Sequence, residues 1–376
     1  MKIKKIGYSV LLLCFFFQIN AQTKLISKEN KTKSSKEVKL AKKEEKAKKA
    51  YAKRVSKADK KYDNYEYVDA IKAYRKVMEK GDFDEKLLQR LANSYYFTAD
   101  LRNAEKWYGE LYRINKNQLP EYLYRYAQSL KSVGHYQRAD QILEIFNTRA
   151  ASENRAALVR NEKNYLDEIK SNSGRFVIAD AGVNSEFSDY GGVIYDNKII
   201  FTSARDTGGI ARKNFKWTNK SFSTFFTADL LPDGSVGKVK LFYKKDHGNF
   251  NESSPVFTKD GRTMYFTRNN FIDGKRGENN KNVTLLKLYK AELVDDKWDN
   301  VKELPFTSDQ YSTAHPALSI DEKTLYFASD MPGTLGESDL YKVTINTDGT
   351  FGTPENLGAR VNTEGRETFP FVSGDN

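Results

Sequence analysis

Two different hydrophobic periods divide the chain. Up to about residue 170 the apolar residues recur every three or four positions, which is the period of one face of an α-helix. Beyond residue 175 they form short alternating runs bounded by Gly, Asp and Asn, which is the pattern of antiparallel strands. The polar segment 171–174 separates the two patterns. The sequence therefore predicts a helical domain over residues 51–170 and an all-β domain over residues 175–376.

The helical part contains a repeat of 34 or 35 residues. Small residues occupy two positions of each unit, and a large residue follows four positions after the second. The first position holds Ala58, Ala92 and Ala127, the second holds Ala70, Ala104 and Ala139, and the large residues are Tyr74, Tyr108 and Leu143. Small residues let paired helices approach closely, and the large residue fills the next groove. This spacing resembles the tetratricopeptide repeat.

The resemblance predicts three repeats from residue 51 to 150 and a capping helix over residues 151–170. An unrelated array of helical hairpins is the alternative. In the first repeat, Lys57 and Lys61 stand where apolar residues are usual. We therefore expect the first helix of this repeat to pack loosely.

The all-β part also repeats. Residues 253–268 align with residues 314–329, which superposes Pro255 on Pro316 and one Tyr-Phe pair on another. An earlier copy covers residues 190–205, and a fourth begins at residue 368. Units of 54 to 65 residues with three or four strands are typical of β-propeller blades. Three blades and one further strand would leave an open sheet edge, so we expect that Asn376 is not the natural terminus.

The third unit carries the most specific motifs of the chain. Asp339-Leu340-Tyr341 is followed by Asn356-Leu357-Gly358, and this order resembles the TolB-like propeller repeat. It is similar in particular to envelope proteins of Bacteroidota that place tetratricopeptide repeats before such a propeller and end in an OmpA-like peptidoglycan-binding domain. That group includes the type IX secretion component PorE and relatives linked to gliding.

This resemblance implies a multidomain α + all-β protein, with a tetratricopeptide α-solenoid followed by an incomplete β-propeller. No OmpA-like segment occurs within residues 1–376. The resemblance therefore does not imply direct peptidoglycan binding by this chain.

The N-terminus has the features of a secretory signal. Lysines at its start are followed by an apolar stretch from Val10 to Phe17 and by Ala21, which predicts a signal peptide over residues 1–21. A lipoprotein anchor on Cys14, the only cysteine, is the alternative, but Leu13 stands where such signals have a small residue. After cleavage the chain has no cysteine and no transmembrane segment. We expect a periplasmic protein associated with the outer membrane.

The formal charge of +12 comes from the N-terminal part of the chain. Residues 22–62 carry 16 basic and 5 acidic side chains, whereas residues 63–376 have a net charge near −2. The folded domains lack the basic excess that is typical of nucleic-acid binding, and we expect no nucleic-acid partner. The Lys-rich arm over residues 22–50 is either a solvated, partly helical segment or a docking element for an anionic surface.

Motifs of known catalytic chemistry are missing from the sequence. There is no Gly-x-Ser-x-Gly elbow and no His-Glu-x-x-His pair. The histidines His135, His247 and His315 fall in three different repeat units, so we expect no shared metal site. Asp and Glu are plentiful, which leaves a carboxylate pair for glycoside cleavage open. We predict a protein without enzymatic activity, metal or cofactor.

Two surfaces are candidates for binding partners. The inner helices of the repeats place amide, aromatic and basic side chains along one concave face, which suits an extended peptide. These groove residues are Gln89, Asn93, Tyr96, Tyr124, Arg125, Gln128 and Lys131. Packing of the two tyrosines between repeats, with the other residues solvated, is the alternative.

The second surface comes from insertions at one equivalent junction of the blades, over residues 203–222, 268–284 and 329–338. Equivalent junctions emerge on one face of a propeller, so these loops should lie side by side. Cations beside aromatic rings are common interface anchors. The candidates are Arg205, Arg212, Lys213, Trp217, Arg268, Phe271, Lys275 and Arg276. Ordinary surface loops are the alternative.

The sequence thus leads to two functional hypotheses. The first is a non-enzymatic scaffold that binds envelope or outer-membrane proteins, as an accessory of type IX secretion or gliding. The alternative is an exported enzyme or capture protein that acts on glycans or peptides at the propeller face.

Overall fold

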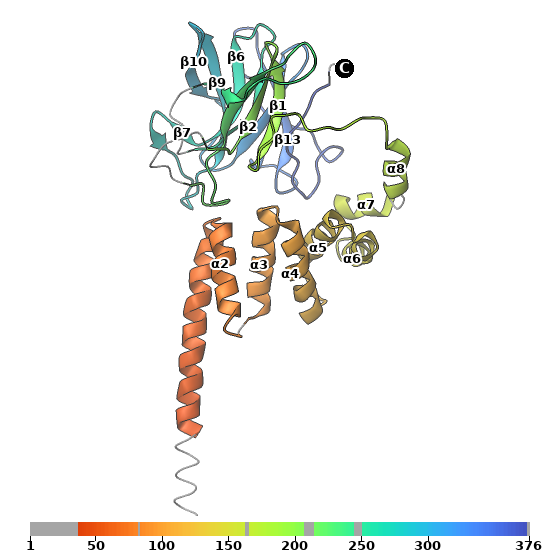
Figure 1. Ribbon diagram of the computed structural model, residues 1–376, viewed down its shortest axis with the longest axis vertical. Helices are drawn as coiled ribbons and strands as arrows, with labels where there is room; N and C mark the ends of the chain where they lie inside the picture. The colour runs from red at the N-terminus through yellow and green to blue at the C-terminus, as the bar shows by residue number, and fades with distance from the viewer. Residues whose placement is uncertain (1–36, 82, 162–164, 207–213, 244–249, 374–376) are drawn as a thin grey trace, which may run out of the picture.

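The computed structural model describes residues 37–81, 83–161, 165–206, 214–243 and 250–373. In Figure 1 the helices form one array, and the sheets form a second array above it. The predicted signal peptide, with Cys14, and the first part of the basic arm lie outside the described residues. None of the helices in the described ranges is both long and apolar enough to cross a membrane.

Each of the three helical repeats is a pair of helices joined by a short turn. The first pair is a helix described over residues 37–63 and α2 (Tyr67–Met78), the second is α3 (Glu85–Phe97) with α4 (Leu101–Ile114), and the third is α5 (Pro120–Ser132) with α6 (Tyr136–Arg149). Within the predicted cap the structure describes two helical segments, α7 (Asn154–Asn161) and α8 (Tyr165–Asn172), and residues 162–164 lie outside the described ranges. Asp84 and Asp100 cap α3 and α4 by accepting hydrogen bonds from backbone N–H groups.

The six repeated alanines lie in the core of the helical array. All of them are completely buried, and the three large residues that follow are at most 3% exposed. The alanines are Ala58, Ala70, Ala92, Ala104, Ala127 and Ala139. Their small side chains let neighbouring helices approach closely, so the 34- to 35-residue spacing marks the core of the array.

Replacing Ala104 by leucine is expected to lower the free energy of unfolding by about 1–3 kcal/mol, because a close-packed site has no space for the larger side chain. Thermal unfolding followed by far-ultraviolet circular dichroism measures the effect. Ala47→Leu is the matched control, since Ala47 is exposed on the first helix. Equal losses in the two variants would contradict this account of the packing.

The first helix contacts the array only from Tyr51 onward, and its described residues before that point are exposed. Ala58 is completely buried, and the Tyr62 hydroxyl accepts a hydrogen bond from Asn93 Nδ2 of α3 at 3.0 Å. Lys57 is exposed, and Lys61 forms ion pairs with Glu66 and Asp69. Lys57 makes no ion pair with the described part of the array, whereas Lys61 joins the first helix to Asp69 of α2.

The all-β part consists of three four-stranded antiparallel sheets, as predicted for blades. Blade 1 contains β1 (Asp189–Tyr195), β2 (Lys198–Ser203), β3 (Thr224–Asp229) and β4 (Lys240–Leu241). Blade 2 contains β5 (Glu252–Phe257), β6 (Thr263–Asn269), β9 (Leu286–Val294) and β10 (Lys297–Glu303). Blade 3 contains β11 (Thr313–Leu318), β12 (Thr324–Ser329), β13 (Asp339–Thr344) and β14 (Glu355–Asn356). A hairpin of β7 (Phe271–Ile272) and β8 (Lys275–Arg276) is inserted in blade 2.

The first strands of successive blades contact each other, and each has an irregularity at the same place. Gly191, Ser254 and His315 adopt positive φ angles there, of 62°, 53° and 57°. The backbone N–H of Ser254 donates to the Thr202 hydroxyl of blade 1 at 3.3 Å, and that of His315 donates to the Thr267 hydroxyl of blade 2 at 2.8 Å. Each of these bonds joins one blade to the next.

Candidate functional site

The loops between the second and third strands of blades 1 and 3 contact the helical array. In blade 1, Trp217 Nε1 donates to the backbone carbonyl of Phe97, at the end of α3, at 2.9 Å. The indole ring stacks on Tyr65 and meets Tyr67 edge-on, with ring centroids 6.0 and 4.9 Å away. This aromatic contact joins the blades to the first two helix pairs.

An ion pair lies beside the tryptophan. Lys216 Nζ of the loop is 2.8 Å from Glu66 Oε1, and Lys61 reaches the other oxygen of Glu66 from the first helix. Burial favours the neutral form of Glu66, but the hydrogen bonds from Lys216 and Lys61 outweigh it and lower the pKa of this carboxyl. Glu66 is therefore ionised at neutral pH and bridges the two arrays.

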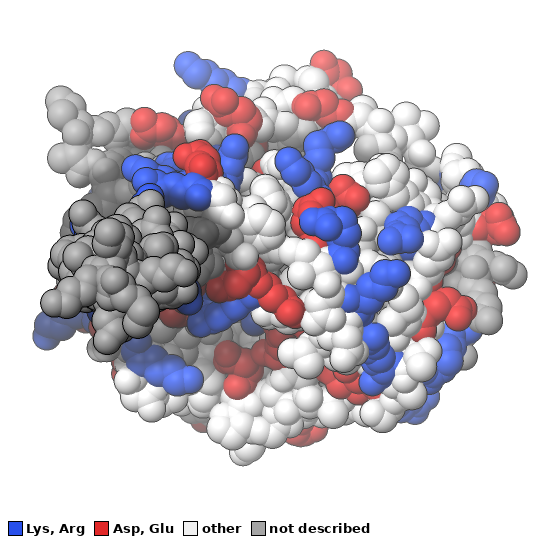
Figure 2. Space-filling view, turned by 90° about the horizontal axis from the view of Figure 1, so that it is seen from below, with Lys and Arg blue, Asp and Glu red and all other residues white. Residues whose placement is uncertain are grey.

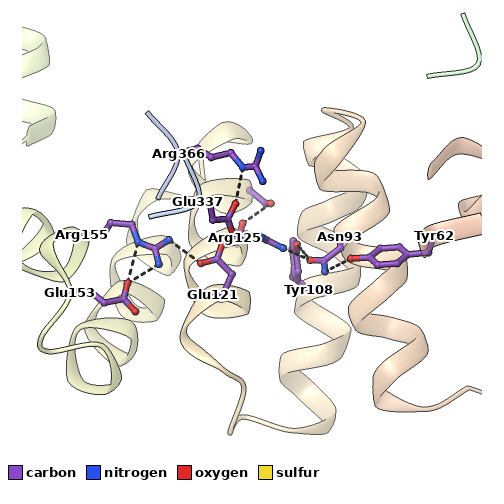
Figure 3. Close-up of polar contacts among 10 residues, drawn as sticks. Tyr62, Asn93, Tyr108, Glu121, Arg125, Glu153, Arg155, Glu337 and Arg366 are labelled. Atoms are coloured by element: carbon purple, nitrogen blue, oxygen red, sulfur yellow. Dashed lines mark hydrogen bonds and ion pairs between the residues drawn. The ribbon is translucent and has the colours of Figure 1, made fainter. Parts of the chain in front are cut away.

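A second contact lies at the other end of the array and is shown in Figure 3. Glu337, in the loop between β12 and β13, is 3.7 Å from Arg125 of α5 and accepts a hydrogen bond from Arg366 at 2.7 Å. The Glu364 carboxylate accepts from the backbone N–H of Asn154, the first residue of α7, at 2.9 and 3.0 Å. A carboxylate at a helix N-terminus is favoured by the helix dipole.

Asn93 is the centre of a polar network that connects the three helix pairs (Figure 3). It is 4% exposed, and it donates to Tyr62 while its Oδ1 accepts from Tyr108 at 2.7 Å and from Arg125 at 3.1 Å. These partners come from all three helix pairs. The Asn93 amide therefore holds the repeats in register, since a buried polar group needs its hydrogen-bond partners.

Two arginines extend the network along the groove. Arg125 pairs with Glu121 at 2.9 Å, and Arg155 of α7 pairs with the second oxygen of Glu121 and with Glu153. Glu121 thus lies between the two guanidinium groups (Figure 3). Alternating acidic and basic side chains thus form a row of ion pairs from Glu153 through Arg125 to Glu337 of blade 3.

Some of the groove residues named from the sequence contact other groups of this chain, and others are half-buried on α5. Asn93, Arg125, Tyr96 and Tyr124 contact other groups of this chain, because Arg125 lies over the Tyr96 ring and Arg155 over the Tyr124 ring. Gln89 donates to Gln118 at 3.1 Å. Gln128 and Lys131 are half-buried on α5. Binding of a partner by these side chains stays a prediction.

The loop residues named from the sequence lie at the joint with the helices, on the exposed hairpin or inside the blades. Trp217 lies at the joint with the helices, whereas Lys275 and Arg276 are exposed on the β7–β8 hairpin. Arg205 pairs with Asp189 within blade 1, Arg268 is only 9% exposed and pairs with Glu252, and Phe271 packs on Phe250. Arg212 and Lys213 lie outside the described residues. The contact residues Glu337, Glu364 and Arg366 were not among the candidates.

The histidines do not converge in the described structure. His135 is exposed at the start of α6, and His247 lies outside the described ranges. His315 stacks on Phe369, with ring centroids 3.7 Å apart, and burial lowers its pKa to about 4. Within the described part of the chain, no group of three His, Cys, Asp or Glu side chains has the arrangement of a metal site.

Parts of this fold are similar to solved structures. Yeast Tom70 matches 33% of this chain over 26% of its own length, with 18% identity and a TM-score of 0.29. The first tetratricopeptide domain of Spaghetti (RPAP3), solved with an HSP90 peptide, matches 32% of this chain over 93% of its own length, with 16% identity and a TM-score of 0.27. A putative TolB from Agrobacterium tumefaciens matches 47% of this chain over 50% of its own length, with 17% identity and a TM-score of 0.27.

Peptidases and glycoside hydrolases also match, over 43% to 46% of this chain. No protein-family model matches the sequence, and no curated protein does. This chain spans about a quarter of Tom70 and half of the TolB structure. All of the TM-scores quoted are below 0.5, so the description of the fold rests on the helix pairs and blades themselves.

Proposed function

We propose that this protein is a non-enzymatic scaffold of the bacterial cell envelope, in which the helical array and the blades bind different protein partners. The observation that carries the proposal is the joint between the two arrays. Trp217 holds one end of it and Glu337 the other, so two surfaces suited to binding keep a set relative position. The resemblance of the blade motifs and the predicted signal peptide support a place at the outer membrane, as an accessory of type IX secretion or gliding.

The β7–β8 hairpin is the best surface for a partner on the blades. It emerges at the same junction of blade 2 as the Trp217 loop of blade 1 and the Glu337 loop of blade 3. Lys275 and Arg276 are exposed at its end, and Arg276 contacts Glu278. Exposed cations on a hairpin suit an acidic patch on a partner protein.

Reversing this charge tests the proposal. Lys275→Glu with Arg276→Glu is expected to reduce, by about tenfold or more, the stoichiometric recovery of outer-membrane proteins with the tagged full chain, because like charges then face each other. Lys238→Glu with Lys302→Glu is the matched control, since both lysines are exposed elsewhere on the blades. Equal recovery with both variants would remove the hairpin from the proposal.

Turnover of a polysaccharide or peptide that one carboxylate substitution abolishes would establish the enzymatic alternative.

A further inference from the structure

Seven lysines of the first helix lie on one side of it. They are spaced three or four residues apart, and at about 100° per residue they fall within an arc of about 80°. We call them the lysine stripe, and they are Lys39, Lys42, Lys46, Lys49, Lys53, Lys57 and Lys60. All seven are exposed. A helix of this length carries the stripe over about 32 Å in a nearly straight line.

The stripe points away from the helical array. The opposite side of the same helix makes the contacts with the array, through buried Ala58 and through the hydroxyls of Tyr62 and Tyr51, which bond to Asn93 and Asp84. Figure 1 shows that this helix projects beyond the other helices of the array. The stripe can therefore approach a large surface without interference from the rest of the described structure.

The charge of the stripe is largely uncompensated. Lys49 pairs with Glu45 at 2.7 Å, and the other six lysines form no ion pair with any residue in the described ranges. The remaining acidic residues of the helix, such as Glu44 and Asp59, lie outside the arc of the stripe. By contrast, Figure 2 shows basic and acidic side chains interspersed over the face of the helical array seen from below. Lys43 and Lys48 are exposed on the same helix outside the arc, so the stripe is the densest row of basic side chains on this helix but does not include all of them.

We infer that the lysine stripe docks this protein on a bilayer surface that contains anionic lipid headgroups. The stripe offers ammonium groups only, without an arginine fork for bidentate bonding or an aromatic ring for stacking. Such a row recognises charge density rather than the shape of one ligand, and a planar layer of headgroups can contact its whole length. A curved acidic protein would contact only part of it. This inference does not depend on the scaffold function.

Vesicle sedimentation of the full chain tests the inference. We expect binding to vesicles of phosphatidylcholine with about 30% phosphatidylglycerol, and a loss of binding as salt rises from about 0.05 M to about 0.5 M, because salt screens surface charges. Lys42→Gln with Lys46→Gln and Lys53→Gln should lower the partition coefficient about a hundredfold at low salt. Glutamine keeps the helix, since its helix propensity is close to that of lysine.

The matched control removes the same charge elsewhere, as Lys116→Gln with Lys238→Gln and Lys302→Gln, at three exposed lysines outside the first helix. We expect this control to bind almost as well as the unaltered chain. An equal loss in both triple variants would show that net charge, not the stripe, drives binding. Equal binding to pure phosphatidylcholine, or binding to polyglutamate or DNA but not to anionic vesicles, would also overturn the inference.

Discussion

Replacing Arg268 by alanine is expected to lower the free energy of unfolding of the blades by about 3–5 kcal/mol, because the change leaves a buried carboxylate without its cation. Glu252 is 1% exposed, and its Oε1 accepts two hydrogen bonds from Arg268, at 2.9 and 2.7 Å. Hydrogen exchange in urea, measured at the amides of β5 and β6, should show the loss.

The surroundings of this pair explain the size of the effect. The Arg268 guanidinium lies 4.8 to 5.3 Å from the ring centroids of Phe250, Phe266 and Tyr289, and the residue is only 9% exposed to water. Burial and the nearby charge of Glu252 raise the pKa of Tyr243 well above its usual value, and its hydroxyl donates to the same carboxylate.

Two further variants make the prediction specific. Arg268→Met with Glu252→Gln should be more stable than Arg268→Ala alone, because no buried charge then remains. Arg276→Ala should cost less than about 1 kcal/mol, since the side chain of Arg276 is 60% exposed in its pair with Glu278. If Arg276→Ala were as damaging as Arg268→Ala, burial of the ion pair would not be the cause.

Replacing Trp217 by alanine is expected to separate the helical array from the blades. A tryptophan at the centre of a protein contact typically contributes about 2 kcal/mol or more, which corresponds to about a thirtyfold shift toward the separated arrangement. The variant loses both the stacking on Tyr65 and the hydrogen bond to Phe97. Small-angle X-ray scattering should show a larger radius of gyration, and limited proteolysis should cut the segment 173–188 faster.

Trp217→Phe is the conservative companion of this variant. It keeps an aromatic ring against Tyr65 and Tyr67 and removes only the hydrogen bond from Nε1, so it should lie between the alanine variant and the unaltered chain. Adding Glu337→Ala to Trp217→Ala should enlarge the effect, because it removes the contact with Arg125. Unchanged scattering in the double variant would show that other contacts hold the two arrays together.

The main features of the fold could be predicted from the sequence because both arrays are repetitive. Paired alanines marked each contact between helices, and all six are completely buried. The Tyr-Phe pairs marked the second strand of blades 2 and 3. The loose packing expected for the first helix agrees with its burial, since Ala58 is the only buried residue in its described range 37–63.

The joint between the arrays could be predicted only in part. Trp217 was selected because an aromatic residue among cations is common in interfaces, but its contact with Tyr65 joins segments 152 residues apart, and no local pattern reveals such a pair. In the sequence, Glu337 and Glu364 cannot be distinguished from other surface carboxylates. Only the fold shows that they contact Arg125 and Asn154. Arg268 was selected as an exposed cation because sequence alone does not show which strand-end charges are turned inward.

The Thr202 hydroxyl connects blade 1 to blade 2, and the Thr267 hydroxyl connects blade 2 to blade 3. The aligned residue of blade 3 is Ala328, which has no hydroxyl group. The segment that follows blade 3 is held instead by hydrogen bonds between Ser338 and Glu367 and by the stacking of Phe369 on His315. The three seams are thus unequal by one bond, because only the first two have a threonine hydroxyl that accepts from the backbone of the following segment.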